Sequence, residues 1–361
     1  MVPLQFGSRR WGSGYWAAPL EDVPSPTVTN AKLATTQVDA SVSLLHTTRE
    51  FWNRLRAEYP APRALVYTTF EQTVLPQNTV DMLNTFDGVV VPSQFNFDSF
   101  RASGVTVPIS VVPHVVANGV PRGPTESIDP RSLSSRIKST TFVVSVIGPW
   151  QARKAIASSI EAFLRAFGPD DDVLLIVKTS VRDFLTHTPV ELSVARILAG
   201  HRRVPPVQLI VRDLSDSEMS AWMRRSDCFL SLSRGEGFGL TIAEAIAAGA
   251  PAVITGWSAP LEYLGLDYPL VVDHDMVEVA SEPTDGWAEP VGEWARANID
   301  HAASLLRWVY ENREAAAGLV AAAQRQLAAT CAPHIIAPRL FEVLGLRGGF
   351  GPESRRGGSA I

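Results

Sequence analysis

The sequence is poor in cysteine, in charge and in long apolar runs. It holds two cysteines, Cys228 and Cys331, far apart, and no N-x-S/T glycosylation sequon, which argues against a disulfide-stapled secreted protein. Charged residues make up 19% of the chain, below the usual ~25%. The 32 Lys and Arg against 37 Asp and Glu leave a net charge of −5. Because no basic excess exists, a nucleic-acid partner is not expected.

No apolar run approaches the ~20 residues that a membrane span needs. The best run, Ala245 to Ile254, is interrupted by Gly249 and Pro251. The first residues, MVPLQFGSRRWGSGYW, lack the apolar stretch of a secretory signal. These absences predict a reduced, cytoplasmic protein with no transmembrane segment. The 361 residues, 46% of them apolar, suffice for two domains, at ~150 residues for each domain.

From residue 41 onward, short β-rich apolar runs alternate with segments of helical spacing. Such alternation predicts an α/β protein with parallel sheets covered by helices, the doubly wound arrangement. The runs are apolar almost throughout, which suits strands buried on both faces. The expected strands are Val42–Leu45, Ala64–Tyr67, Gly88–Val91, Ile109–Val112, Phe142–Ile147, Val173–Val177, Val207–Val211, Cys228–Leu232, Ala252–Ile254 and Leu270–Val272.

A segment rich in Pro, Gly and Ser divides the chain. It predicts a linker at 121–140 between a Rossmann-like domain at 1–120 and a second at 141–330, facing each other across a cleft. A long helical region is expected from Gly292 to about Thr330, and 331–361 is expected to be a carboxyl-terminal segment with a disordered tail. The first domain is short, so we expect it to be a trimmed one.

The most informative stretch is SLSRGEGFGLTIAEAIAAGAPAVIT, from Ser231 to Thr255. It starts as an apolar strand, turns through a Gly-rich segment and becomes a helix that Gly249 is expected to stop. At the turn, Gly237 and Gly239 would let the backbone approach a ligand. The N–H groups near Leu240 and Thr241 would then point out of the helix start, which makes an anion site suited to phosphate.

Two acids, Glu236 and Glu244, bracket this turn with seven residues between them. A carboxylate beside a phosphate site would repel the ligand unless it served another group. Ribose and sugar hydroxyls are the obvious partners, since a carboxylate can accept two of them. The alternative, an acid that merely stabilises a helix start, would explain one of the two glutamates.

The residues from Glu236 to Pro251, EGFGLTIAEAIAAGAP, closely resemble the E-x7-E motif of retaining GT-B glycosyltransferases of family GT4. The resemblance extends through VIGPWQARKAIASSIEAFLRAF, where Arg153 and Lys154 match the family's basic pair. The amino-terminal segment YTTFEQTVLPQNTVDMLNTFDGVVVPSQFNFDSFRASGV is similar to the family's acceptor domain. Together the similar segments span about 60–310.

The resemblance implies a GT-B fold and sugar transfer from a nucleotide-diphosphate sugar with retention and without a metal ion. It assigns Arg153 and Lys154 to the diphosphate, Glu236 to the donor sugar and Glu244 to the ribose. Gly237, Phe238, Gly239, Leu240 and Thr241 would complete the donor site. Cations and N–H donors aimed at the leaving group lower the barrier, because negative charge grows there.

This sequence departs from the family at two positions. Pro149 follows Gly148 where many members carry an Arg, so Arg153 would serve alone or be replaced. Many members have a His near the position where this chain has Phe70 and Glu71. Glu71 is therefore either an acceptor-side group or a surface acid, and His114 is a second candidate for the acceptor side. His46 ends a strand near the expected cleft.

Other functions remain open at this point. A catalytically inactive GT-B binding or scaffold protein is one, since fold does not secure activity. A transferase that modifies a macromolecule such as DNA or protein is another, although the acidic balance disfavours nucleic acid. Asp273 and Asp275 resemble a metal-binding D-x-D but follow the E-x7-E unit. Weak membrane contact could come from Phe51, Trp52 and Leu55, unless their apolar side is core.

Overall fold

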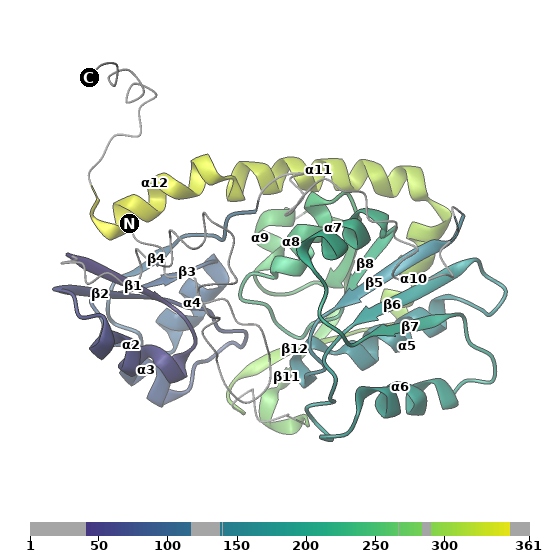
Figure 1. Ribbon diagram of the computed structural model, residues 1–361, viewed down its shortest axis with the longest axis horizontal. Coiled ribbons are helices and arrows are strands. Elements are labelled where there is room, and N and C mark those ends of the chain that lie inside the picture. Colours follow the sequence, from purple (N-terminus) through teal and green to yellow (C-terminus); the bar gives the residue numbers. More distant parts are fainter. Residues whose placement is uncertain (1–40, 117–137, 139, 266, 284–289, 347–361) are drawn as a thin grey trace, which may run out of the picture.

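The computed structural model describes residues 41–116, 138, 140–265, 267–283 and 290–346. Two parallel sheets dominate it (Figure 1). The first has the order β1-β2-β3-β4, and its strands are covered by three helices from the same part of the chain. The strands are β1 (Val42–His46), β2 (Arg63–Tyr67), β3 (Gly88–Val91) and β4 (Ile109–Val111), and the helices are α2 (Trp52–Glu58), α3 (Gln77–Leu83) and α4 (Gln94–Ala102).

The second sheet has six parallel strands in the order β10-β9-β8-β5-β6-β7. The strand order reverses between β5 and β8, and ligands of open α/β sheets bind at the carboxyl ends of the strands at such a point. The strands are β5 (Phe142–Ile147), β6 (Val173–Lys178), β7 (Val207–Ile210), β8 (Cys228–Ser231), β9 (Ala252–Thr255) and β10 (Val271–Val272). The helices between them are α5 (Ile156–Ala166), α6 (Val190–Ala199), α7 (Asp216–Arg225), α8 (Leu240–Ala247) and α9 (Pro260–Leu264).

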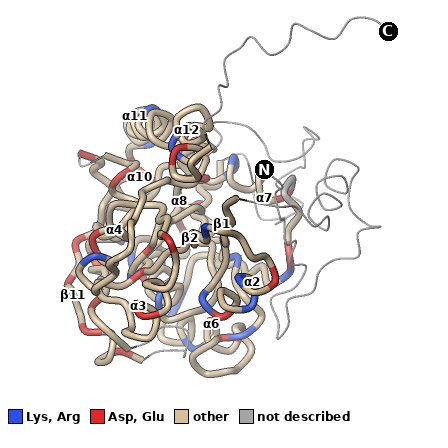
Figure 2. Tube along the Cα trace, turned by 90° about the vertical axis from the view of Figure 1, so that its left-hand side faces the viewer, with Lys and Arg blue, Asp and Glu red and all other residues tan. Residues whose placement is uncertain are grey.

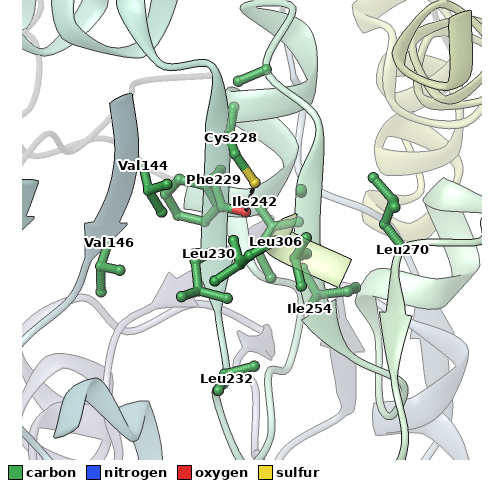
Figure 3. Close-up of a cluster of buried hydrophobic side chains, with 14 of the residues drawn as sticks. Val144, Val146, Cys228, Phe229, Leu230, Leu232, Ile242, Ile254, Leu270 and Leu306 are labelled. Carbon is green, nitrogen blue, oxygen red and sulfur yellow. Dashed lines mark hydrogen bonds between the residues drawn. The ribbon is translucent and has the colours of Figure 1, made fainter. Parts of the chain in front are cut away.

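The main core lies on both faces of the second sheet. Figure 3 shows side chains from β5, β8 and β9 packed against Ile242 of α8 and Leu306, with Cys228 among them. Because helices cover both faces, these strands are apolar almost throughout, as the sequence predicts. All ten expected strands are confirmed, with boundaries that differ by at most two residues.

Two further strands, β11 (His274–Glu278) and β12 (Glu293–Ala297), pair antiparallel, and a 3₁₀ turn at Val279–Ser281 follows β11. The expectation of a helix from Gly292 is therefore wrong at its start. Ala295 N–H of this hairpin bonds to the Arg234 carbonyl at 2.9 Å, so β12 braces the Gly-rich turn. Glu293 exchanges two bonds with Thr73 of the first domain, at 3.1 and 2.8 Å.

Three helices close the described chain: α10 (Ile299–Glu311), α11 (Arg313–Cys331) and α12 (Pro333–Leu344). Figure 1 shows α11 over the second sheet and α12 crossing back to the first. Ile336 of α12 packs on Tyr67, Val90 and Val112, so α12 contributes to the hydrophobic core of the first domain. Residues 333–344 are thus helical, whereas the expected tail at 347–361 and most of the expected linker lie outside the described residues.

Within the described residues, 313–344 is the stretch that is long and apolar enough to cross a membrane by length and composition. Its mean hydropathy is high because α11 is rich in alanine, but α11 contains no uninterrupted apolar run of the length that a membrane span needs. In the folded chain several of its buried side chains, among them Ala323 and Leu327, pack in the main core. The amphipathic segment of α2 is likewise not free for a membrane, since Trp52 and Leu55 are buried in the first domain.

Charge is mixed over the first domain. Figure 2, which faces that side, shows basic segments near α2 interspersed with acidic ones on neighbouring elements. Several of the basic groups are held by their own domain: Arg49 bonds to Thr79 at 2.6 Å and Arg56 to the Thr85 carbonyl at 2.8 Å.

Candidate active site at the domain junction

Two loops meet at the point where the strand order of the second sheet reverses. One follows β5 and forms a 3₁₀ turn at Ala152–Lys154; the other follows β8 and runs through Ser233 to Gly239. Arg234 N–H donates to the Arg153 carbonyl at 2.7 Å, which ties the loops together. Ala155, with φ of +46°, turns the chain from the 3₁₀ turn into α5. The fold therefore brings the predicted basic pair beside the predicted Gly-rich turn.

The predicted catalytic residues form one ion cluster. Lys154 Nζ lies 2.5 Å from Oε1 of Glu236, and an Arg153 guanidinium nitrogen lies 3.3 Å from Oε2 of Glu236. The same Arg153 reaches the other domain, 3.5 Å from Oε1 of Glu71, and donates to the Gly235 carbonyl at 2.8 Å. Glu71 is thus a residue of this site rather than a lone surface acid.

Burial and pairing set the charges of this cluster. Burial by itself would raise the pKa of Glu236, but Lys154 and Arg153 outweigh that effect and lower the pKa to about 2. Burial lowers the pKa of Lys154, and the Glu236 carboxylate opposes that shift. Glu236 is 8% exposed, so the carboxylate is held ionised in a nearly dry position. Such a site holds fixed charges where little solvent screens them.

The start of α8 offers backbone donors next to the cluster. Gly239, with φ of +82°, caps the helix, and its carbonyl accepts the N–H groups of Ile242 and Ala243. By helix geometry, Leu240 and Thr241 then supply the N–H groups left for a ligand. Leu240 is 42% exposed. Glu244 lies in the same helix, half-buried, and the expected stop at Gly249 is confirmed with φ of +96°.

At Gly237 a segment of the protein itself closely approaches the turn, and the approach of a ligand there stays a prediction. A Cβ atom on Gly237 would lie 1.4 Å from Thr69 Oγ1, and one on Gly235 would lie 2.0 Å from the Glu71 carbonyl oxygen. Both glycines therefore admit the 69–71 segment of the first domain. Phe238 is buried and packs edge-on against His114, with 5.0 Å between ring centroids.

Several contacts across the junction had no signal in the sequence. The hydroxyl of Ser93, the N-cap of α4, donates to the Gly237 carbonyl at 2.8 Å. The Glu262 carboxylate accepts the N–H groups of Gln94 and Phe95 at 2.8 and 2.7 Å. These bonds join the second domain to the start of α4, and only the repeated glycines of the 235–239 turn could have hinted at so close an approach.

The D-x-D pair does not form a metal centre with other acids. Asp273 pairs with His301 at 3.0 Å and Asp275 lies 3.8 Å from Arg296. Both carboxylates are 80% exposed. Among the residues that the structure describes, no group of three or more His, Cys, Asp or Glu side chains is arranged to hold a metal ion.

Solved structures that superpose on this chain include glycosyltransferases of GT-B fold. TarM superposes with a TM-score of 0.60 at 13% identity, covering 86% of this chain and 55% of TarM. A UDP-forming α,α-trehalose-phosphate synthase from Burkholderia xenovorans gives 0.62 at 13% identity, covering 88% of this chain and 75% of the synthase. HepE from Anabaena, solved with UDP and glucose, gives 0.60 at 16% identity, covering 84% and 77%. These likenesses establish the fold as GT-B.

The sequence comparisons cover less of this chain than the structural ones do. A phosphatidyl-myo-inositol mannosyltransferase from Propionibacterium freudenreichii subsp. shermanii is 34% identical over 96 residues, which is 26% of this chain and 25% of that enzyme. The chain thus matches about a quarter of this curated relative and about half of TarM. A family model described as "Family 4 Glycosyltransferase in conflict systems" matches residues 125–337, more than half of the chain. The chain therefore belongs to the family 4 glycosyltransferases of conflict systems.

Proposed function

We propose that this protein transfers a sugar from a nucleotide-diphosphate sugar to a hydroxyl acceptor, with retention of configuration and without a metal ion. The observation that carries the proposal is the ion cluster at the strand-order reversal, where Arg153 and Lys154 pair with Glu236, three residues before Gly239, the N-cap of α8. Two cations and backbone N–H groups together suit a diphosphate. Family membership supports the same reaction class.

In the proposed reaction, the bond between the anomeric carbon and the diphosphate oxygen breaks while the acceptor oxygen bonds to the same face of the anomeric carbon. The acceptor's proton passes to the departing diphosphate, and the products are a glycoside and a nucleoside diphosphate. Arg153 and Lys154 stabilise the charge that grows on the leaving group. No metal is needed in this scheme because the two side chains provide the positive charge.

Glu236 has two roles in this proposal. Without the donor its carboxylate neutralises the basic pair, at 2.5 Å from Lys154 and 3.3 Å from Arg153. With the donor bound, diphosphate oxygens share those cations, and Glu236 accepts hydrogen bonds from hydroxyls of the donor sugar. Glu244 on α8 holds the ribose. Glu71 and His114, which the first domain supplies, lie on the acceptor side.

A donor screen with two variants tests this proposal. Purified protein is incubated with UDP-, GDP- and ADP-sugars, and mass spectrometry records sugar that is released or transferred. We expect one donor class to be consumed, and we expect Lys154→Ala and Glu244→Ala to lose that turnover. If both variants turn over like the wild type, the site assignment is wrong. If the wild type consumes no donor and binds none, the inactive scaffold function is favoured instead.

A further inference from the structure

Three rings of the first domain gather at the carboxyl edge of its sheet. His46 ends β1, Tyr67 ends β2, and His114 lies three residues beyond β4. The ring centroids are separated by 4.5 Å (His46 and Tyr67), 5.2 Å (Tyr67 and His114) and 5.7 Å (His46 and His114). Phe238, two residues after Glu236, contacts His114 from the second domain. The cluster therefore adjoins the proposed donor site.

The hydrogen bonds of Tyr67 determine which nitrogen of His114 carries the proton. The Tyr67 hydroxyl donates its single proton to the Val112 carbonyl at 2.6 Å, and the same oxygen lies 3.2 Å from Nδ1 of His114. Because that hydroxyl proton is already engaged, Nδ1 must be the donor of the second bond. The neutral ring then carries its lone pair on Nε2.

Surrounding groups keep the cluster uncharged. Burial, assisted by the neighbouring His46, lowers the pKa of His114 to about 4. Burial also lowers the pKa of His46. Burial raises the pKa of Tyr67, with Cys331 of α11 adding to that effect. At neutral pH, His114 is therefore a hydrogen-bond acceptor at Nε2 and not a cation.

This lone pair faces no partner within the described part of the chain, since the bonds of the His114 ring there run through Nδ1. The ring is half-buried, and His46, which stacks on it, is exposed, so the ring cluster borders on solvent. An imidazole held in one tautomer beside aromatic faces suits a ligand with both hydroxyl groups and apolar C–H faces. Sugars and related polyols have this chemistry.

We propose that Nε2 of His114 accepts a hydrogen bond from a hydroxyl group of the acceptor substrate, and that this acceptor is a sugar-like polyhydroxy compound. Tyr67 is a positioning residue, because it acts by fixing the tautomer of His114. The inference rests on the proposed function and deepens it by naming the class of acceptor. The proton of the reacting hydroxyl still leaves with the diphosphate, so His114 binds and orients the acceptor.

The first experiment reads the tautomer directly. Nitrogen-15 NMR of the full-length protein with labelled histidine identifies the protonated ring nitrogen. We expect the Nδ1–H form for His114 at pH 7, and we expect Tyr67→Phe to shift the ring toward a mixture of tautomers. An Nε2–H ring or an imidazolium at pH 7 would overturn the proposal.

The second experiment measures ligand binding through the same nitrogen-15 NMR signals of the histidine rings. Glucose, mannose, N-acetylglucosamine, myo-inositol and glycerol serve as hydroxylated probes. We expect at least one to perturb the ring signals of His46 and His114. His114→Phe keeps a packed ring but removes the lone pair, and it should weaken binding of that probe about tenfold. Tyr67→Phe should weaken it less, and the matched control His201→Gln, at a surface pair with Glu161, should leave it unchanged.

The outcomes separate this inference from the proposed function. Stabilisation by nucleotide sugars depends on Arg153 and Lys154, so His114→Phe should retain it. If the probes bind at His114 but no nucleotide sugar binds, the proposed function fails while the sugar-like subsite stands. If no probe perturbs His114, or if His114→Phe binds the probes as tightly as the wild type, the inference is wrong.

Discussion

The two sides of the domain junction differ in how they hold their functional groups. On the side of the second domain, Arg153, Lys154 and Glu236 are charged and paired, with side chains at most 19% exposed. On the side of the first domain, His46, Tyr67 and His114 are uncharged rings that pack against one another. Glu71 of the first domain reaches the charged side, at 3.5 Å from Arg153.

This difference matches the two halves of the proposed reaction. A departing diphosphate gains negative charge and needs fixed cations, whereas an acceptor hydroxyl is neutral and needs hydrogen-bond acceptors. The E-x7-E segment with its basic partners accounts for the charged side of the junction, whereas the three rings come together only when the first domain folds.

Lys154→Ala should have the largest effect, because it removes one of two cations from the charged side. We expect turnover of the donor to fall about 10²–10³-fold, as for loss of a group that stabilises transition-state charge. Steady-state rates with the donor found in the screen measure this. Lys138→Ala changes an exposed lysine and should retain the wild-type rate. Equal rates for the two variants would show that the charged side does not act on the leaving group.

Acid should weaken the charged side through Glu236. Its folded pKa of about 2 lies below the unfolded value, so its contribution to stability is present above about pH 5 and is lost as the pH falls toward 2. The contribution is about 3 kcal/mol at pH 7. Urea unfolding at pH 7 and pH 3 should therefore show a smaller pH dependence for Glu236→Gln than for the wild type.

Glu218 provides a matched comparison, since its pKa is also lowered to about 2, first by Arg212, but at the surface. Salt at 1 M should remove most of the effect of Glu218→Gln and less of the effect of Glu236→Gln, because buried pairs are screened less. The same salt sensitivity at both glutamates would contradict a dry ion cluster.

Gly237→Ala tests the contact between the two sides. Its Cβ would overlap Thr69 Oγ1, so we expect a loss of about 1–3 kcal/mol from overpacking. Thr69→Gly removes the overlapping atoms, and Gly237→Ala in that background should cost much less. A double-mutant cycle by urea unfolding gives the coupling between the two positions. If the two changes are additive, Thr69 does not contact this glycine.

Ile336→Val should have the smallest effect, about 1 kcal/mol, because it deletes one buried methyl group. Ile336 is 3% exposed against Tyr67, Val90 and Val112, so the loss should appear in the first domain although the residue is distant in sequence. Hydrogen exchange of β2 and β3 should quicken, while β5 and β6 stay protected. Faster exchange in β5 instead would contradict the placement of α12.

The sequence predicted the elements whose pattern is local. Each strand of the parallel sheets is a short apolar run, and the Gly-rich turn with its acids is contiguous from Ser231 to Thr255. The hairpin was missed because β11 and β12 are short and partly charged, and β12 is held by Arg234 rather than by a pattern of its own.

The sequence placed His46 and His114 near the expected cleft, but Tyr67 and the clustering of the three rings were missed for a different reason. His46 lies 21 residues before Tyr67, and His114 lies 47 residues after it. Only the parallel order of β1, β2, β3 and β4 brings the three rings together. Similarly, Glu262 contacts the start of α4 from a five-residue helix that carries no motif. Contacts between domains depend on how the sheets are placed, which residue spacing does not encode.

Direct binding of nucleotide sugars to the charged side tests the central claim most directly. Thermal or urea unfolding of the wild type and Lys154→Ala is compared with UDP-, GDP- and ADP-sugars in turn. At about 100 times its Kd, the matching donor should stabilise the wild type by about 2.7 kcal/mol. The same concentration should leave Lys154→Ala almost unshifted. Equal stabilisation of both proteins, or none by any donor, would contradict a diphosphate site at Arg153 and Lys154.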